Sequence, residues 1–412
     1  MSDNLVVVGA GHATGQLVVS LRQSGFTGSI SVIGDEALPP YQRPPISKKY
    51  LAGELEAGRQ NNKPPDFYAA NDIDLRLNTR VTSIDRQAHT VSLDDGTTLP
   101  WDKLVLATGS RARRLDNPGH DKQGIHYLRS TADVDAIRAD FEKAQRMTII
   151  GGGYIGLEVA AVAVKHGLEV HVVEHMDRLL SRVVSPAISD FYQDVHQAEG
   201  VHIHLNNGVV EFHGDARVSS MSLVDGDTLA TDLVVIGIGV IPNTELAEAC
   251  GLACDNGIVV DEFSARSEAA VRANGDCTNH PNPLLGRRLR LESVPNALEQ
   301  AKTAAATLCG ESRAYAQVPW FWSDQYDLKL QIVGLTDGYD QTVIRGDMSA
   351  RQFSCFYLRE DRLIAVDAVN SPREFMLSKA AVAAGAKIPA EVLADSDENL
   401  KDAASRWPGD TT

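Results

Sequence analysis

The chain has 412 residues, more than one hydrophobic core usually supports, so we expect two or three domains. Its formal net charge of -16 argues against nucleic acid as a main partner, because binding a duplex needs a broad basic face. No apolar run approaches the roughly 20 residues that span a bilayer, and the first strand begins by Leu5. These features predict a soluble, cytoplasmic protein without membrane insertion.

A strand, glycine loop, helix, strand and acid follow one another near the amino terminus. The apolar residues 5–8 lead into a loop at Gly9, a helical stretch follows, and residues 30–33 end beside Asp35 and Glu36. In such a unit the glycines let the backbone approach a pyrophosphate, and the acid binds the ribose. Asp35 is the preferred ribose acid and Glu36 its rival.

The same order returns later in the chain. Residues 147–150 lead into a loop at Gly151, and a helix and a second strand follow, ending at Glu174. Two copies, each in full strand–loop–helix–strand context, predict two bound dinucleotides. A carboxylate at Glu174 would repel the extra phosphate of NADPH, so we expect NADH. Arg178 and Arg182 are candidates for the pyrophosphate.

The first loop departs from the usual pattern. Its third glycine position holds Thr14, whereas the second loop has Gly156 there. That position sets how closely helix and strand approach. We expect the helix to shift slightly and the site to be kept.

Three apolar runs ending in turns complete the pattern of a flavoprotein. Residues 104–106 precede Ala107, Thr108 and Gly109, and residues 234–236 precede Gly237. A third run, after residue 271, ends at Asp276, an acid suited to a ribityl hydroxyl of FAD.

The order of these segments predicts the fold. We expect an α/β protein with two Rossmann-like domains and a carboxyl-terminal α+β domain, as in the architecture of glutathione reductase. Residues 1–112 and 241–318 form the FAD domain, 113–240 the inserted NADH domain, and 319–412 the last domain. Polar composition from about Pro389 predicts that part of this segment is a loosely ordered tail.

Cysteine and histidine spacing limits the chemistry. The five cysteines contain no C-x-x-C pair, which argues against a disulfide relay beside the flavin. The histidines show no metal spacing, and no metal site is predicted. His12 lies in the first loop and receives no catalytic role.

Several longer motifs resemble one family, the ferredoxin reductases of oxygenase systems. The motifs occur in the family's order and extend to about residue 375; they are Pro40 to Lys48, Ala107 to Arg111, Gly151 to Glu158, Gly237 to Thr244, Gly275 to Cys277, Glu292 to Ala297 and Pro319 to Gln325. The resemblance implies FAD and NADH as cofactors and a [2Fe–2S] ferredoxin as acceptor, which would serve a cytochrome P450 or a Rieske oxygenase. Alternatives are reduction of rubredoxin, or a redox-sensing interaction protein resembling apoptosis-inducing factor.

Motifs and resemblance together give the candidate residues. Those for FAD are Gly9, Gly11, His12, Ala13, Asp35, Arg43, Lys48, Val81, Ala107, Thr108, Gly109, Arg129, Gly275, Asp276, Val294 and Trp322. Those for NADH are Gly151, Gly153, Tyr154, Ile155, Glu158, Glu174, Arg182, Ile238 and Gly239. The resemblance implies that Lys48 lies near the flavin's reactive nitrogen, pairs with Glu158, and is joined in the reaction by Trp322.

Overall fold

The computed structural model describes residues 3–56, 58–265, 270–283 and 285–409. The chain forms two compact units. Unit 1 comprises Met1–Arg43, Glu56–Arg111 and Val240–Pro319, and unit 2 comprises Pro44–Leu55, Ala112–Gly239 and Trp320–Thr412.

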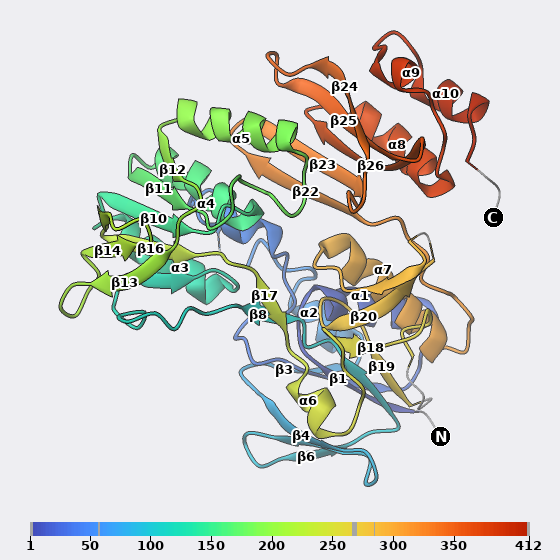
Figure 1. The fold of residues 1–412 in the computed structure, drawn as a ribbon. Helices are drawn as coiled ribbons and strands as arrows, with labels where there is room; N and C mark the ends of the chain where they lie inside the picture. The colour runs from blue at the N-terminus through green and yellow to red at the C-terminus, as the bar shows by residue number, and fades with distance from the viewer. Residues whose placement is uncertain (1–2, 57, 266–269, 284, 410–412) are drawn as a thin grey trace. The chain divides into compact units, whose positions relative to one another are not determined.

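Unit 1 contains a five-stranded parallel sheet in the order β19-β7-β1-β2-β3 (Figure 1). Its strands are β1 (Asn4–Val8), β2 (Ser29–Ile33), β3 (Ile73–Arg76), β7 (Lys103–Leu106) and β19 (Val271–Ala273). Leu5 and Val7 point to one core cluster, Val6 and Val8 to the other. Burial on both faces explains why β1 is a continuous apolar run.

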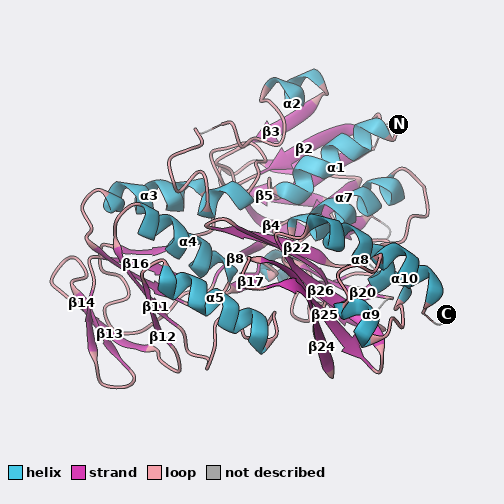
Figure 2. Ribbon diagram, turned by 90° about the horizontal axis from the view of Figure 1, so that it is seen from above, coloured by secondary structure: helices cyan, strands magenta, loops and turns pink. Residues whose placement is uncertain are grey.

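Helices cover one face of this sheet and a small antiparallel sheet the other. Helices α1 (His12–Gln23) and α7 (Val294–Leu308) lie side by side in both views (Figures 1 and 2) and share a core with the parallel strands. The opposite core contains β4 (Val81–Asp85) and β5 (Thr90–Leu93), which pair with each other, and β5 also pairs with β6 (Thr98–Pro100). The remaining elements of this unit are α2 (Asp66–Ala70), β17 (Val240–Pro242), α6 (Glu245–Ala249), β18 (Ile258–Val259), β20 (Thr278–Asn282) and β21 (Arg287–Leu289).

Unit 2 repeats the parallel sheet, in the order β12-β11-β10-β16-β9. Its strands are β9 (Ile125–Tyr127), β10 (Arg146–Ile150), β11 (Glu169–Val173), β12 (Val201–His204) and β16 (Leu233–Ile236), and its helices are α3 (Thr131–Phe141), α4 (Tyr154–Lys165) and α5 (Pro186–Ala198). A three-stranded meander of β13 (Val209–His213), β14 (Ser220–Leu223) and β15 (Thr228–Ala230) packs against Ile150 and Val173 of the sheet. β8 (Ser110–Ala112) pairs with β17.

The last part of unit 2 is a five-stranded antiparallel sheet in the order β22-β23-β26-β25-β24. Its elements are β22 (Trp320–Gln325), β23 (Leu328–Gly334), β24 (Gln341–Asp347), β25 (Gln352–Arg359), β26 (Arg362–Val369) and α8 (Pro372–Ala384). With the two parallel sheets, this confirms the predicted fold class.

Most of the segment from Pro389 to Gly409, in which part of a loosely ordered tail was expected, is folded. It contains α9 (Ala390–Ala394) and α10 (Leu400–Arg406). The buried Arg345 donates to the carbonyls of Leu393, Asp395, Ser396 and Glu398. A buried guanidinium needs such acceptors, and supplying them fixes the tail. The acceptors are backbone atoms, which composition does not reveal.

The segment Pro44–Leu55 packs within unit 2, although the sequence predicts it as part of the FAD domain. It begins with the short helix η1 (Pro44–Ser47), followed by Lys48. Tyr50 donates to Asp135 of α3 at 2.7 Å, and the Arg138 guanidinium lies over the Tyr50 ring. The exact domain limits remain a prediction. Among the described residues, no helix has the length and apolar character needed to cross a membrane.

Candidate dinucleotide sites and the charge pair

The first glycine loop has the shape that a pyrophosphate needs. Gly9 has φ +108°, and a Cβ there would lie 2.2 Å from the Ala107 carbonyl oxygen. At Gly11 a Cβ would meet nothing within 4 Å, so the loop is open above it. Helix α1 begins directly afterwards with no side-chain cap and no acid in its first turn. The positive end of its dipole therefore faces the open space, which fits an anionic group.

Thr14 replaces a glycine without disturbing this loop. Its side chain is fully buried, and its hydroxyl donates to the Gly9 carbonyl at 2.6 Å. In the second loop a Cβ at Gly156 would lie 2.1 Å from the Gly151 carbonyl. At the position where a side chain in the second loop would clash with the Gly151 carbonyl, Thr14 of the first loop instead forms a hydrogen bond. Threonine in place of glycine is therefore compatible with a dinucleotide site.

The carboxyl ends of β7 and β19 converge on the same loop. A Cβ at Gly275 would lie 3.2 Å from that of Ala13, and Ser110 donates to Asp276 at 3.2 Å. Thr108 exchanges two hydrogen bonds with Asn243, at 2.7 and 2.9 Å. Candidate residues from three distant parts of the sequence therefore surround one sheet edge.

The two candidate ribose acids after β2 differ in their partners. Glu36 accepts from Tyr41 at 2.6 Å and from Arg43. Asp35 is exposed and pairs with Arg80 at 3.1 Å. Because Glu36 is held by two buried or half-buried neighbours, the contacts favour Asp35 as the ribose acid.

The other FAD candidates occupy defined places in their own units. Val81 begins β4 and is buried, and Val294 begins α7, where Ser293 caps the helix. Arg129 lies in unit 2, where its backbone N–H donates to Asp133 of a capping box at 3.0 Å.

The second loop has the same local geometry as the first. Gly151 again has φ +108°, and a Cβ there would lie 2.5 Å from the Gly237 carbonyl. The space above Gly153 is open, and α4 starts with no acid in its first turn. Ile155 in that turn is 40% exposed. The repeat seen in the sequence is therefore a repeat in structure, and this loop also fits a pyrophosphate.

Glu174 lies against the second loop. Its carboxylate accepts from the N–H groups of Gly152 at 2.6 Å and Met176 at 2.8 Å. These bonds fix an anionic group where a ribose acid is expected.

The two candidate arginines separate clearly. Arg178 donates to the carbonyls of Ser181 and Val184, so it holds the turn. Arg182 is exposed, and its guanidinium lies 3.9 Å from the position of a Cβ on Gly239. Gly239 follows Ile238 in the loop after β16. Among the described residues, Arg182 makes no backbone hydrogen bond that would compete with a phosphate, so it is the better pyrophosphate candidate of the two.

Lys48 and Glu158 form an ion pair within unit 2. Lys48 Nζ lies 2.8 Å from Glu158 Oε1, and the two side chains are 16% and 1% exposed. Ser47 donates to Glu158 Oε2 at 2.5 Å, and Ser323 donates to Oε1 at 2.6 Å. A buried carboxylate is stable only when paired and hydrogen-bonded, and all three groups meet that need.

A row of polar groups continues behind Ser323. Gln325 donates to Ser323 at 3.1 Å, its oxygen lies 2.8 Å from His196 Nε2, and Tyr326 lies 3.0 Å from His196 Nδ1. Burial lowers the pKa of His196 to about 4, so the ring is neutral. With Nε2 protonated, every member donates toward Glu158. An amide does not readily pass a proton, so this row orients the carboxylate.

Aromatic side chains line the same part of unit 2. Trp322 is half-buried and stacks on Trp320, with centroids 5.6 Å apart. The Lys379 ammonium lies 4.1 Å from the Trp320 ring centroid. Phe321 packs on Tyr154, at 4.8 Å. Trp320 is therefore a packing residue, whereas Trp322 has fewer ring contacts.

Four residues that hold the Lys48–Glu158 ion pair were not predicted from the sequence. Ser47 lies inside the Pro40 to Lys48 motif, and Ser323 and Gln325 lie inside the Pro319 to Gln325 motif, so position beside a candidate was the available signal. His196 lies on α5 with no motif around it, and only the tertiary structure identifies it.

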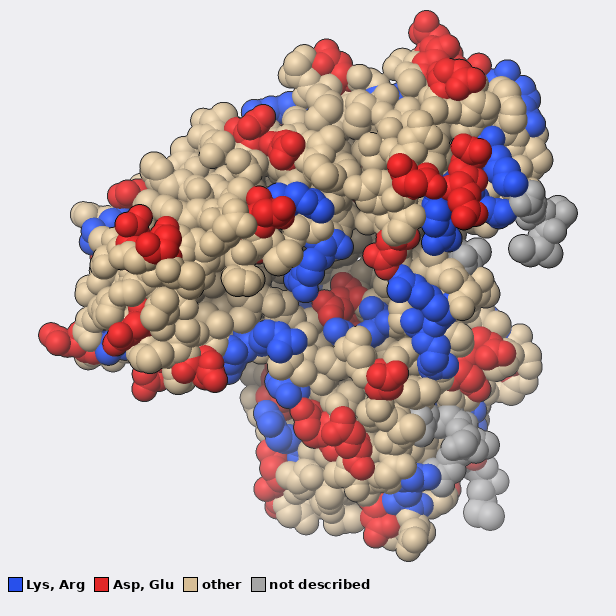
Figure 3. Space-filling view, in the orientation of Figure 1, with Lys and Arg blue, Asp and Glu red and all other residues tan. Residues whose placement is uncertain are grey.

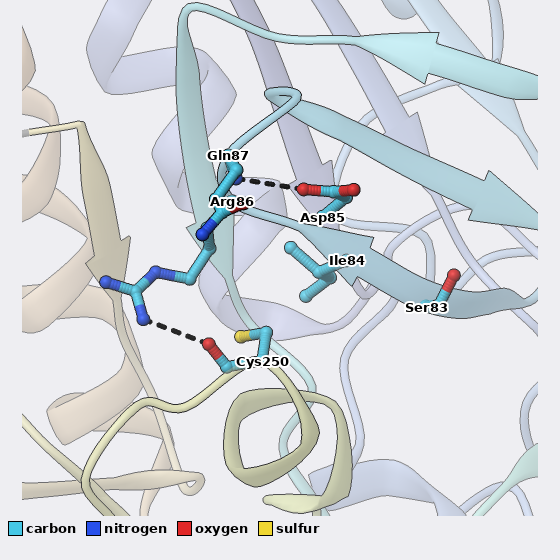
Figure 4. Close-up of a pocket in the computed structure, with 6 residues that line it drawn as sticks. All are labelled: Ser83, Ile84, Asp85, Arg86, Gln87 and Cys250. Atoms are coloured by element: carbon cyan, nitrogen blue, oxygen red, sulfur yellow. Dashed lines mark hydrogen bonds between the residues drawn. The ribbon is translucent and has the colours of Figure 1, made fainter.

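A hollow on unit 1 lies away from these loops (Figure 4). It is lined by Ser83, Ile84, Asp85, Arg86, Gln87 and Cys250, and Arg86 donates to the Cys250 carbonyl at 2.9 Å. No candidate dinucleotide residue lines it, so it receives no catalytic role. On the face drawn in Figure 3, acidic and basic side chains are interspersed.

Two parallel sheets, each with a glycine loop and a ribose acid, define an oxidoreductase class with two dinucleotides. A family model described as pyridine nucleotide-disulphide oxidoreductase matches residues 3–301, and one described as reductase C-terminal matches residues 320–404. The chain therefore belongs to the pyridine nucleotide-disulphide oxidoreductase family and uses FAD and NAD(H).

Relatives and solved structures narrow the family. The chain is 43% identical over 407 residues to putidaredoxin reductase of Pseudomonas putida, covering 97% of this chain and 96% of the relative. It is 42% identical to rhodocoxin reductase of Rhodococcus erythropolis, covering 98% and 95%. The crystal structure of the covalent putidaredoxin reductase–putidaredoxin complex matches with TM-score 0.95 and 42% identity, covering 98% and 99%. The resemblance to ferredoxin reductases is confirmed.

Proposed function

We propose that this protein is an NADH-dependent ferredoxin reductase whose [2Fe–2S] partner supplies a cytochrome P450 or a Rieske oxygenase. Near full-length similarity to putidaredoxin reductase supports this acceptor. FAD, when bound, supplies the step from two-electron hydride acceptance to single-electron release. The protein binds both dinucleotides, orients them, and places charge beside the reacting ring.

The candidate residues divide between these tasks. The loops at Gly9 and Gly151 would receive the two pyrophosphates at helix N-termini, and Asp35 and Glu174 would bind the riboses. Arg182 supports the NADH phosphates. The remaining residues named from the sequence complete the two sites as predicted there.

Lys48 acts as a charge-placing residue. Its ammonium, held by Glu158, would place positive charge where bound FAD gains negative charge, and the buried pair is stronger than it would be in water. Ser47 and Ser323 keep the carboxylate turned toward Lys48. Trp322 would pack beside the ring of bound FAD.

The cysteines bear on which class of acceptor the protein reduces. Cys277, which follows Asp276, is a buried thiol whose pKa is raised by burial. Cys250 and Cys254 each donate to a nearby carbonyl, of Ala247 and Leu252. Because the sequence has no C-x-x-C pair, we infer that electrons leave the flavin without a disulfide relay. Free thiols also agree with a cytoplasmic location.

A reconstitution separates the candidate acceptors. The purified holoprotein is mixed with NADH and either a [2Fe–2S] ferredoxin or a rubredoxin, and reduction of each iron centre is followed by its absorbance. We expect the ferredoxin to be reduced much faster. Faster reduction of rubredoxin would overturn the acceptor assignment, and turnover with neither would favour a sensing role.

A further inference from the structure

Four metal-binding side chains gather on one face of the unit 2 sheet. Glu169 and His171 lie on β11, and His202 and His204 lie on the neighbouring strand β12. His171 is the register partner of His202. Because side chains two apart on a strand share a face, and register partners do too, all four point to the same side.

The distances within this group suit a single ion. His171 Nε2 lies 3.1 Å from Glu169 Oε1, and ligand atoms of Glu169, His171 and His202 all lie within 4.8 Å of one another. In a tetrahedral zinc site, bonds of about 2.0–2.2 Å place ligand atoms roughly 3.4 Å apart. Small side-chain rotations would bring the ligand atoms from separations of up to 4.8 Å to the roughly 3.4 Å of a tetrahedral site.

His204 supplies a second, independent observation. Its Nε2 lies 3.1 Å from His171 Nδ1. A metal-bound histidine usually donates its other ring N–H to a neighbouring acceptor, which fixes the tautomer. In the structure His171 Nε2 donates to the Glu169 carboxylate; with a metal ion on Nε2 in place of that proton, Nδ1–H would donate to His204 Nε2.

We propose that Glu169, His171 and His202 bind a divalent transition-metal ion such as Zn²⁺, with water completing its coordination. Two imidazoles and one carboxylate form a ligand set that zinc accepts. Asp225 and Asp227 add negative charge near His204, while Arg146, the register partner of Glu169, is paired with Asp232.

This metal site is separate from the predicted NADH site. Glu169 begins β11 and Glu174 follows its end, so the two lie roughly 17 Å apart along the strand. A bound ion would join β11 to the edge strand β12. Register between strands creates the site, which explains why spacing along the chain predicts none.

Direct binding tests the proposal. Holoprotein freed of metal with a chelator is titrated with Zn²⁺ by calorimetry, beside the variants His202→Ala and Glu169→Gln, which change exposed residues. The matched control is His213→Ala, because His213 lies on the separate meander, where its ring contacts Ser222 at 2.6 Å and Glu211 at 3.8 Å.

We expect one tight Zn²⁺ per chain in the wild type and in the control, and at least tenfold weaker binding in both site variants. A Co²⁺ spectrum should lack thiolate bands, which separates this site from the free cysteines. Unchanged affinity in His202→Ala, or thiolate bands that account for the bound ion, would overturn the proposal.

Discussion

Ser323 gives the sharpest test of how the charge pair is held. Its hydroxyl donates to Glu158 Oε1 at 2.6 Å and accepts from Gln325 at 3.1 Å, and both Ser323 and Glu158 are buried. A hydrogen bond to a charged group contributes about 1.5–3 kcal/mol. We therefore expect Ser323→Ala to lower the free energy of unfolding by about 2–3 kcal/mol.

The same change should slow the reaction. With one donor lost, the carboxylate is less firmly oriented toward Lys48, and a loss of about 1.4 kcal/mol in the transition state corresponds to tenfold in rate. Stopped-flow measurement of flavin reduction by NADH gives that rate, and urea unfolding gives the stability.

A second buried serine in the same sheet provides the control. Ser354 is fully buried, and its hydroxyl has no hydrogen-bond partner within the described residues. Ser354→Ala should leave both quantities nearly unchanged. If Ser323→Ala and Ser354→Ala behave alike, the orienting role of Ser323 is refuted.

Three further predictions follow from charge and burial. Burial raises the pKa of Asp367 to about 7, so the protein loses stability as the pH rises from about 3.8 to 7. In urea unfolding at pH 8, Asp367→Asn should therefore be more stable than the wild type by up to about 4 kcal/mol. An Asp367→Asn variant that is no more stable would contradict this prediction. Burial lowers the pKa of His196 to about 4. The stability that the neutral ring gives to the folded state is therefore complete above pH 6.5 and falls by about 3 kcal/mol toward pH 4. Urea unfolding of the wild type should lose more stability over that range than unfolding of His196→Gln. Glu174→Gln should reduce the NADH to NADPH ratio of kcat/KM at least tenfold, because it removes the charge that repels the extra phosphate, and an unchanged ratio would assign that selectivity elsewhere.

Local patterns predicted the parts of the fold that depend on local physics. The chain at Gly9 and Gly151 has φ +108° and a close backbone contact, which only glycine accepts. The glycine motif therefore predicted the loop geometry. The all-apolar strand β1 reported burial on both faces. These requirements act within a few residues, and sequence shows them directly.

Features built by contacts across the chain were not predictable in the same way. The segment around Lys48 packs in unit 2 through Tyr50 and Ser47, whereas its place in the sequence suggested the FAD domain. His196 reaches the charge pair only through two neighbours on β22. The buried Arg345 orders a tail that composition describes as polar.

The central claim is that NADH electrons pass through bound flavin to a ferredoxin. The most direct test is a single-turnover, anaerobic stopped-flow experiment in which the holoprotein is reduced with one equivalent of NADH and then mixed with oxidised [2Fe–2S] ferredoxin. We predict fast flavin bleaching by NADH, slower bleaching by NADPH, and prompt flavin reoxidation with two ferredoxins reduced per flavin. Flavin that stays reduced in the presence of ferredoxin would contradict the proposed acceptor.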